Sequence, residues 1–163
     1  MSDATALTLT AIGHVRSPFR SKVGVPIQTA GAPDVPGELI VLPPFAAGLK
    51  DLDAFEYLIL LTHLHLVAQE SLEVVPFLDT VPRGVFATRA PNRPNRIGLS
   101  VVRLVSIDGL RIRFAGNDMV DGTPVLDIKP YVPAFDVRQT SRIGWFSAHL
   151  DQLPGKLSDG RMG

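Results

Sequence analysis

A chain of 163 residues, of which 45% are hydrophobic and 20% charged, is long enough to form one domain with a buried core. Sixteen Lys and Arg balance sixteen Asp and Glu, which argues against a disordered chain and a strongly basic nucleic-acid wrapper but allows a local basic patch. The absence of Cys excludes disulfides, thiolate zinc sites and cysteine nucleophiles. Because neither a signal-peptide pattern nor an apolar run of about 18 residues occurs, we expect a cytoplasmic protein without membrane insertion.

Short, β-branched apolar runs separated by turn residues dominate the chain. Fourteen Gly and fourteen Pro recur along it and do not gather in one linker. The runs predict strands at residues 8–12, 38–42, 57–67, 85–88, 99–107, 110–114 and 125–128. Regularly spaced strands with few helices favour a mainly β fold, either a small β-barrel or a curled sheet.

Helical signals are weak. Asp53 is a candidate cap for a short turn, and residues 68–75 are candidates for two helical turns that Pro76 would end. We expect one barrel domain over residues 1–136. An extended C-terminal tail, residues 137–163, is polar and Gly-rich, and should pack on the surface or on a partner subunit.

Common nucleotide and zinc motifs are missing from the sequence. It has no Gly-rich dinucleotide fingerprint after a strand, no phosphate-binding loop that ends in Lys and Ser or Thr, and no HExxH. These absences argue against a conventional dinucleotide or nucleoside-triphosphate enzyme.

The segment GVFATRAPNRPNRIGLS, residues 84–100, carries Arg89, Arg93 and Arg96 beside Pro91 and Pro94. Proline fixes φ and extends the residue before it, so the guanidinium groups have little conformational freedom to lose on binding. Guanidinium forks suit carboxylates and phosphates. The segment is therefore either an anion-binding loop or an ordinary solvated loop.

Two further segments carry polar residues in apolar surroundings. In GNDMVDGTPVLDIKPY, residues 116–131, Asp118 interrupts strand-like sequence where an unpaired charge is costly, so it belongs either to a buried ion pair or to a ligand site.

In YLILLTHLHLV, strand alternation would put His63 and His65 on one face. One of these imidazoles could line a pocket as a polar contact or proton acceptor, or both could be structural; a zinc site lacks a third ligand.

Five segments occur in a characteristic order: IGHVRSPF (12–19), PIQ (26–28), FEYLILLTHLH (55–65), GVFATRAPNRPNRIGLS (84–100) and DMVDGTPVLDIKPY (118–131). In order and spacing they resemble the signatures of the TsaA/TrmO family, also called YaeB-like proteins. The sequences IGW (143–145) and SDGR (158–161) resemble the tails of short, archaeal-type members.

The resemblance implies a small β-barrel that binds S-adenosyl-L-methionine, with the cofactor site shared across a homodimer. Family members of known function methylate N6 of threonylcarbamoyladenosine at position 37 of certain tRNAs. Carried over by motif position, the cofactor-binding residues are Gln28, Thr29, Ala30, Gly31, His65, Leu66, Arg89, Leu99, Ala115, Gly116, Asn117 and Asp118.

The chemistry of these residues agrees with such a cofactor. Arg89 suits its carboxylate or adenine acceptors, and Asp118 suits one of its donors. An amide-like acceptor nitrogen is a weak nucleophile, so a base is expected, and His65, Asp118 and Tyr131 are the catalytic candidates. No metal is expected.

Three segments depart from the family pattern. Ile27 replaces the usual Arg, residues 55–58 replace the FSHL motif, and residues 73–77 replace an Arg-Pro-Pro segment. Each change removes polar or basic character, and longer members also carry a C-terminal extension. Two alternatives to a tRNA methyltransferase therefore stay open: an enzyme that methylates a small molecule, and a non-catalytic module that binds the cofactor.

Overall fold

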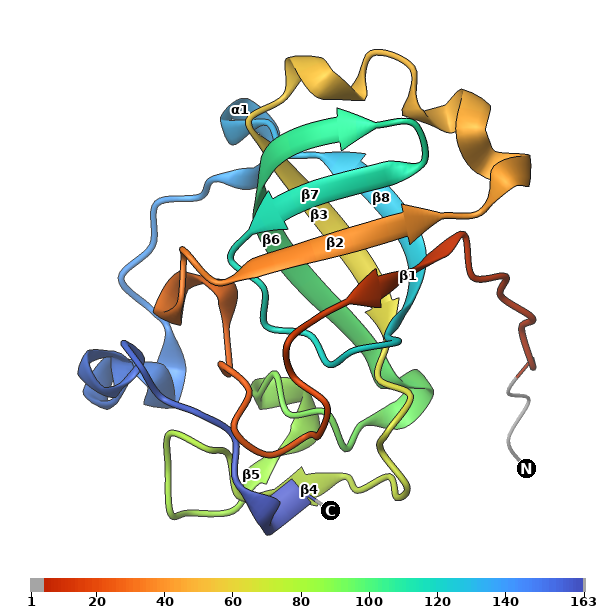
Figure 1. Ribbon diagram of the computed structural model, residues 1–163. Coiled ribbons are helices and arrows are strands. Elements are labelled where there is room, and N and C mark those ends of the chain that lie inside the picture. The colour runs from red at the N-terminus through yellow and green to blue at the C-terminus, as the bar shows by residue number, and fades with distance from the viewer. Residues whose placement is uncertain (1–4, 163) are drawn as a thin grey trace.

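An antiparallel β-barrel forms the body of the protein in the computed structural model, which describes residues 5–162 (Figure 1). The strands close in the order β1-β2-β7-β6-β3-β8. Their bounds are β1 (Gly13–Arg16), β2 (Pro36–Val41), β3 (Tyr57–His63), β6 (Ile97–Asp108), β7 (Arg111–Ala115) and β8 (Pro124–Pro130). A separate pair, β4 (Glu73–Val74) and β5 (Arg83–Gly84), lies below the barrel in Figure 1. The mainly β, barrel-type prediction is confirmed.

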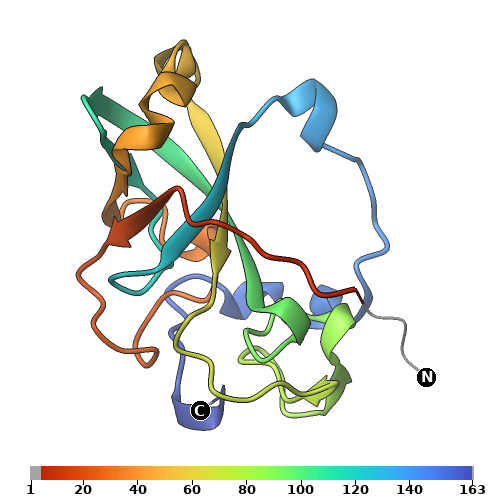
Figure 2. The ribbon, with the colours of Figure 1, turned by 90° about the vertical axis from the view of Figure 1, so that its right-hand side faces the viewer.

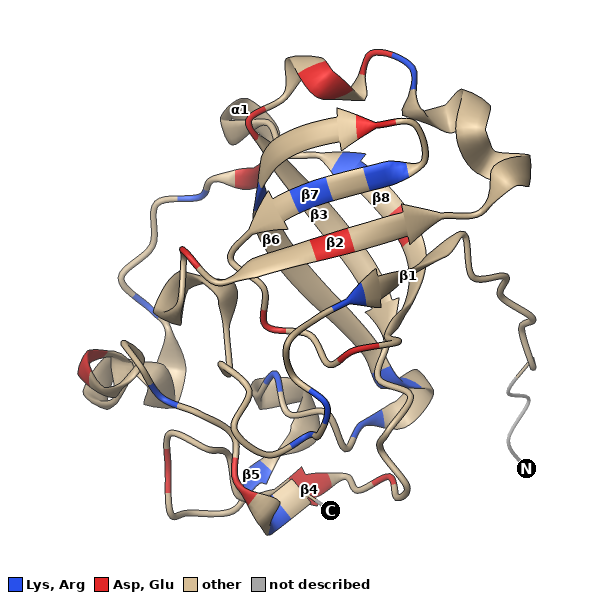
Figure 3. Cartoon of the chain, viewed as in Figure 1, with Lys and Arg blue, Asp and Glu red and all other residues tan. Residues whose placement is uncertain are grey.

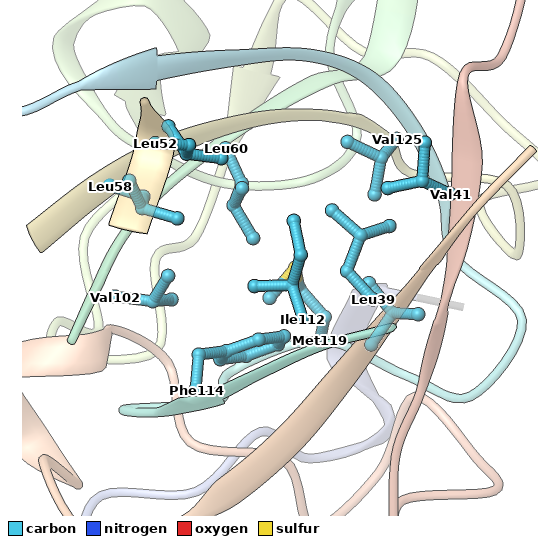
Figure 4. Close-up of a cluster of buried hydrophobic side chains, with 11 residues drawn as sticks. Leu39, Val41, Leu52, Leu58, Leu60, Val102, Ile112, Phe114, Met119 and Val125 are labelled. Atoms are coloured by element: carbon cyan, nitrogen blue, oxygen red, sulfur yellow. The ribbon is translucent and has the colours of Figure 1, made fainter. Parts of the chain in front are cut away.

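Inward-facing side chains fill the barrel (Figure 4). Leu58 and Leu60 of β3, Val102 of β6, and Ile112 and Phe114 of β7 are each at most 2% exposed. Successive side chains of a strand point to opposite faces, so the residues between these face outward. Because the interior is packed, a ligand has to bind at an end of the barrel or on its outer surface.

Two predicted strands are wrong. Residues 8–12 form no strand, and β1 begins at Gly13, where a Cβ would lie only 2.4 Å from the Ile40 carbonyl oxygen. Only glycine permits this approach to β2, and composition alone does not reveal it. Residues 85–87 form a 3₁₀ turn, η4 (Val85–Ala87), because the Thr88 hydroxyl donates a 2.8 Å hydrogen bond to the Val85 carbonyl.

Helical structure within residues 5–162 is limited to short segments, the longest of which has seven residues. The 3₁₀ helices are η1 (Thr29–Gly31), η2 (Pro43–Leu49), η3 (Leu52–Ala54), η4, η5 (Pro94–Arg96), η6 (Gly144–Ala148), η7 (Leu150–Gln152) and η8 (Gly160–Met162), and α1 spans Pro133–Asp136. The helix expected at 68–75 is wrong, because this stretch is extended and contains β4. Asp53 is not a cap either: it lies inside η3, whose N-cap is Asp51. No helix within residues 5–162 is long and apolar enough to cross a membrane.

The C-terminal tail returns to the lower end of the barrel. Residues 133–144 are exposed and arch away from the strands (Figure 2). Farther on, Leu157 pairs with Pro26, and the Ser158 amide donates to the Val25 carbonyl at 2.8 Å. The Arg161 guanidinium donates to the Pro76 carbonyl at 2.9 Å. The tail thus connects the segment before η1 to the loop between β4 and β5.

Candidate active site

A cavity of about 400 Å³ opens at the end of the barrel where β3 ends and β6 begins. Segments that are distant in sequence line it: 22–28, 62–67, 88–93, 97–100, 118–123 and 158–162. It includes six of the expected cofactor-binding residues, which are Gln28, His65, Leu66, Arg89, Leu99 and Asp118. The fold therefore gathers the signature segments around one site.

Asp118 is one of two carboxylates that line this cavity; the other, Asp159, is paired with Arg161 at 2.8 Å. The Ser100 hydroxyl donates to its Oδ1 at 2.6 Å. Burial raises the pKa of Asp118 to about 6, and the Ser100 bond, nearby backbone amides and the charge of Arg89 offset part of that rise. An acid with a pKa near 6 is mostly ionised at neutral pH and can also accept a proton there. Asp118 therefore fits both roles assigned to it, ligand and base.

Arg89 is exposed and lies between two walls of the cavity. Its Nη1 donates a 3.0 Å hydrogen bond to Gln28 Oε1, which joins the arginine loop to the segment before η1. Within the loop, the Ala90 amide donates to the Thr88 hydroxyl at 3.1 Å and Pro91 fixes its own φ, and both limit the loop's conformational freedom. The guanidinium of Arg89 is therefore held at the cavity, and it would lose little conformational entropy when a ligand binds.

The other two arginines of the loop have different contacts. Arg93 donates to the carbonyls of Thr88 and Ala90 at 3.0 and 3.4 Å, so it braces its own loop although it also lines the cavity. Arg96 lies 3.6 Å from a carboxylate oxygen of Glu70. The expectation of three similarly presented guanidinium groups is wrong, because Arg93 bonds within its own loop and Arg96 lies beside Glu70, which is outside the loop.

His65 lies in a turn and not on a strand. β3 ends at His63, so the expected placement of both imidazoles on one strand face is wrong. His65 lines the cavity, whereas His63 faces outward opposite Ile97. Burial, followed by the charge of His63, lowers the pKa of His65 below its usual 6.5. Its imidazole is therefore neutral at pH 7 and able to accept a proton.

The turn η1 supplies Thr29, Ala30 and Gly31 behind Gln28. Ala30 faces a neighbouring cavity, and the Thr29 amide contributes to the stabilisation of the Asp118 carboxylate. A Cβ on Gly31 would lie 2.7 Å from the Leu153 carbonyl oxygen. The glycine is thus required by the close approach of the tail.

Residues 115–117 lie behind the cavity wall. The amides of Gly116 and Asn117 both donate to the Val35 carbonyl at 2.9 Å. The buried Asn117 side chain bonds to the Ser17 hydroxyl at 2.8 Å. These groups hold the turn that leads from the buried Ala115 to Asp118, and their amides are already bonded.

Tyr131 lies at the opposite end of the barrel within this chain. Its amide donates to the Tyr57 carbonyl at 3.0 Å, and the two rings pack edge to face with centroids 6.1 Å apart. Tyr57 begins β3 and His63 ends it, a distance of about 20 Å along an extended strand. The structure therefore separates Tyr131 from the other two catalytic candidates.

Sequence reasoning assigned no role to several residues of the cavity. Ser100, the partner of Asp118, stands inside the IGLS signature, and a polar residue within the predicted strand 99–107 was the available signal. Lys22, Ser158 and Met162 also line the cavity. The tail residues reach it only through the folding back of the chain, which no local pattern predicts.

The three segments that depart from the family pattern do not all lie at the cavity. Ile27 and Phe77 lie on the cavity wall, so their apolar side chains shape the site directly. Residues 55–58 precede and begin β3 at the far end of the barrel. The first and third departures therefore bear on binding at the cavity, whereas the second does not touch it.

Residues 14–137 match the family model described as the tRNA-methyltransferase O N-terminal domain. The chain belongs to the TrmO family. A probable S-adenosyl-L-methionine-binding protein of Pyrococcus abyssi is 49% identical over 150 residues, which cover 92% of this chain and 82% of that protein. The tRNA (adenine(37)-N6)-methyltransferase of Escherichia coli is 39% identical over 132 residues, covering 75% of this chain and 56% of that enzyme.

A solved structure agrees with this TrmO assignment. The crystal structure of TrmO from Pseudomonas aeruginosa superimposes with a TM-score of 0.72 at 40% identity, covering 86% of this chain and 63% of that one. The chain thus spans most of the Pyrococcus relative but little more than half of the bacterial enzymes. The resemblance identified from the sequence motifs is confirmed at the level of family and fold.

Proposed function

We propose that this protein is an S-adenosyl-L-methionine-dependent methyltransferase that acts on N6 of threonylcarbamoyladenosine at position 37 of tRNA. The observation that carries the proposal is the gathering of Gln28, His65, Arg89 and Asp118 around one cavity. The TrmO family assignment and the names of the relatives support it.

The donor set of the cavity fits the cofactor. The guanidinium of Arg89 suits its carboxylate, and the ionised Asp118 suits its ammonium group or another donor. Apolar side chains such as Leu66 and Leu99 provide contacts for the adenine and ribose carbons. When bound, the cofactor supplies an activated methyl group on a sulfonium centre.

The residues of the chain would then perform two tasks. The rigid Arg89 loop and the Asp118 turn fix the reacting groups in line and exclude water, and positioning of this kind contributes on the order of 7–11 kcal/mol to catalysis. The acceptor nitrogen must lose its proton as the new N–C bond forms. The carboxylate of Asp118 and the neutral imidazole of His65 are the cavity groups that can accept it.

The outer face of the barrel supports a homodimer whose subunits share this cavity. β3 and β6 pair so that Ile59 lies opposite Val101, and Leu61 opposite Leu99, all pointing outward. Leu99 is 46% exposed and also lines the cavity. An apolar stripe that reaches the mouth of a site is typical of a surface that a second copy covers.

Light scattering tests the dimer. We expect the wild-type protein to be a dimer at micromolar concentration and Leu61→Arg to be a monomer, because the new charge would be buried in the interface. Val105→Arg is the matched control, since Val105 is 56% exposed near the other end of β6 and lines neither cavity. A monomeric wild-type protein that still binds the cofactor would show that one chain completes the site.

Whether tRNA is the methyl acceptor can be tested by the salt dependence of tRNA binding. Several basic residues are paired with acids: Arg111 and Arg113 with Glu38 at 3.4 and 3.2 Å, and Lys129 with Asp127 at 2.7 Å. Figure 3 accordingly shows both charges interspersed on the barrel. Lys22 and Arg89 both line the cavity, so a tRNA backbone would contact this end of the barrel.

We expect tRNA affinity to fall steeply as salt rises, with Lys22→Ala reducing the log-log slope by about one unit through the loss of one phosphate contact. Lys129→Ala should leave the slope unchanged, because Lys129 is paired and distant on β8. The proposal of a tRNA substrate fails if tRNA affinity is insensitive to salt. That result would favour a small-molecule acceptor or a binding module, the latter consistent with the name of the Pyrococcus relative.

A further inference from the structure

A second cavity of about 350 Å³ lies beside the first, and the C-terminal tail supplies six of its fourteen lining residues. Phe77, from the loop between β4 and β5, forms one wall, and Trp145, Phe146 and Leu150 of the tail form another. Apart from Gln28 and Arg89, the side chains that line it are apolar or aromatic. The cavity therefore offers flat hydrophobic contact with one polar edge.

The two cavities share a wall. Ile27, Gln28, Phe77, Arg89 and Met162 line both of them. A ligand in the second cavity would thus lie next to a ligand in the first, along the side chains that line both. Adjacent sites of this kind suit the two partners of a group transfer, which need their reacting atoms in contact.

The aromatic wall is fixed by contacts that the tail makes. Trp145 Nε1 donates to the Ala87 carbonyl at 2.8 Å, and its ring stacks on Phe146 with centroids 4.0 Å apart and planes 25° apart. The guanidinium of Arg83 lies 5.6 Å from the centre of the Trp145 ring. These contacts hold the ring of Trp145 in place within the wall of the cavity.

We propose that this second cavity takes the purine base of the methyl acceptor, which packs on the aromatic wall and directs its polar edge toward Arg89 and Gln28. Aromatic side chains stack on the flat faces of bases, and an arginine or amide at the edge can bond to their nitrogens and oxygens. The inference rests on the proposed function, because that function places the cofactor in the first cavity. It assigns to the tail a direct part in acceptor binding.

Trp145 is the single tryptophan of the chain, so its fluorescence reports on this wall. With the first site saturated by S-adenosylhomocysteine, we expect adenosine monophosphate and tRNA each to change the fluorescence in a saturable way. Tighter binding of tRNA than of the free nucleotide would identify RNA as the source of the base. If neither probe changes the fluorescence while S-adenosylhomocysteine still binds, the inference is wrong. If S-adenosylhomocysteine itself does not bind, the proposed function fails first.

Two variants locate the binding event. Phe146→Ala should weaken binding of both adenine-containing probes at least tenfold and leave the affinity for S-adenosylhomocysteine within about twofold; Phe86→Ala, at a 76% exposed position outside both cavities, is the control. Leu150→Phe should narrow the cavity with the same pattern and leaves Trp145 as the only tryptophan; Val137→Phe is its control, at a similarly exposed tail position outside both cavities. Competition between S-adenosylhomocysteine and the nucleotide, or an equal loss of both affinities in Phe146→Ala, would assign the cavity to the cofactor and overturn the inference.

Discussion

Replacing Asp118 by Asn is expected to lower methyl transfer at least a hundredfold while leaving the fold intact. The substitution keeps the shape and the bond from Ser100 but removes the negative charge that both proposed roles require. General-base catalysis contributes about 10²–10⁴-fold to a rate, so the loss should be large. Steady-state rates, measured beside cofactor affinity by calorimetry, show which role dominates: a base changes kcat, whereas a ligand changes Kd.

Although Asp118→Asn should lose activity, we expect it to keep or gain thermodynamic stability. The folded-state pKa of Asp118, about 6, lies above its ordinary value of 3.8, so the fold disfavours the ionised form. This cost is absent below pH 4, grows between pH 4 and 6, and reaches on the order of 3 kcal/mol above pH 6. Asp118→Asn should therefore be at least as stable as wild type at pH 7.5 and lack this pH dependence, as thermal unfolding across pH would show. A variant that loses both activity and stability would contradict the account.

Activity in the wild type should rise with pH through about 6, because the ionised carboxylate is the active form. The imidazole of His65 can add to this rise, since burial lowers its pKa below the usual 6.5. The profile of His65→Gln separates the two groups. If the rise persists unchanged in that variant, it belongs to Asp118.

Arg89→Ala is expected to weaken the binding of S-adenosylhomocysteine at least tenfold. Arg89 presents an exposed guanidinium to the cavity, and loss of a charge-assisted hydrogen bond costs about 1.5–3 kcal/mol. Arg111→Ala is the control, because Arg111 pairs with Glu38 on the barrel wall and lines neither cavity. Calorimetry that finds equal effects for the two variants would contradict the assignment of the site.

The barrel was predictable because its strands carry a periodic pattern. Alternation in residues 57–63 and the apolar runs at 99–107 and 110–114 reflect burial on one face, a property that each strand shows locally. The errors occur where one contact overrides composition. At Gly13, the first residue of β1, the backbone of Ile40 lies too close for any side chain. At Thr88, the hydroxyl bonds to the Val85 carbonyl and so favours a turn over a strand.

The candidate site was predictable in part for a similar reason. Arg89 and Asp118 stood out as charges in stiff or apolar segments, and the structure brings both to one cavity. The contributions of Ser100 and Trp145 depend on tertiary contacts, which periodicity does not encode. Tyr131 belongs to the same signature as Asp118, yet β8 carries it to the other end of the barrel.

The central claim is methyl transfer to a defined atom of tRNA, and nucleoside mass spectrometry tests it most directly. The protein would be incubated with S-adenosyl-L-methionine carrying a labelled methyl group and tRNA from cells that contain threonylcarbamoyladenosine, and the tRNA digested to nucleosides. The account predicts labelled N6-methyl-threonylcarbamoyladenosine from position 37 with the wild type, and at least a hundredfold less with Asp118→Asn. Absence of label from every tRNA nucleoside, with cofactor binding and the dimer intact, would contradict it.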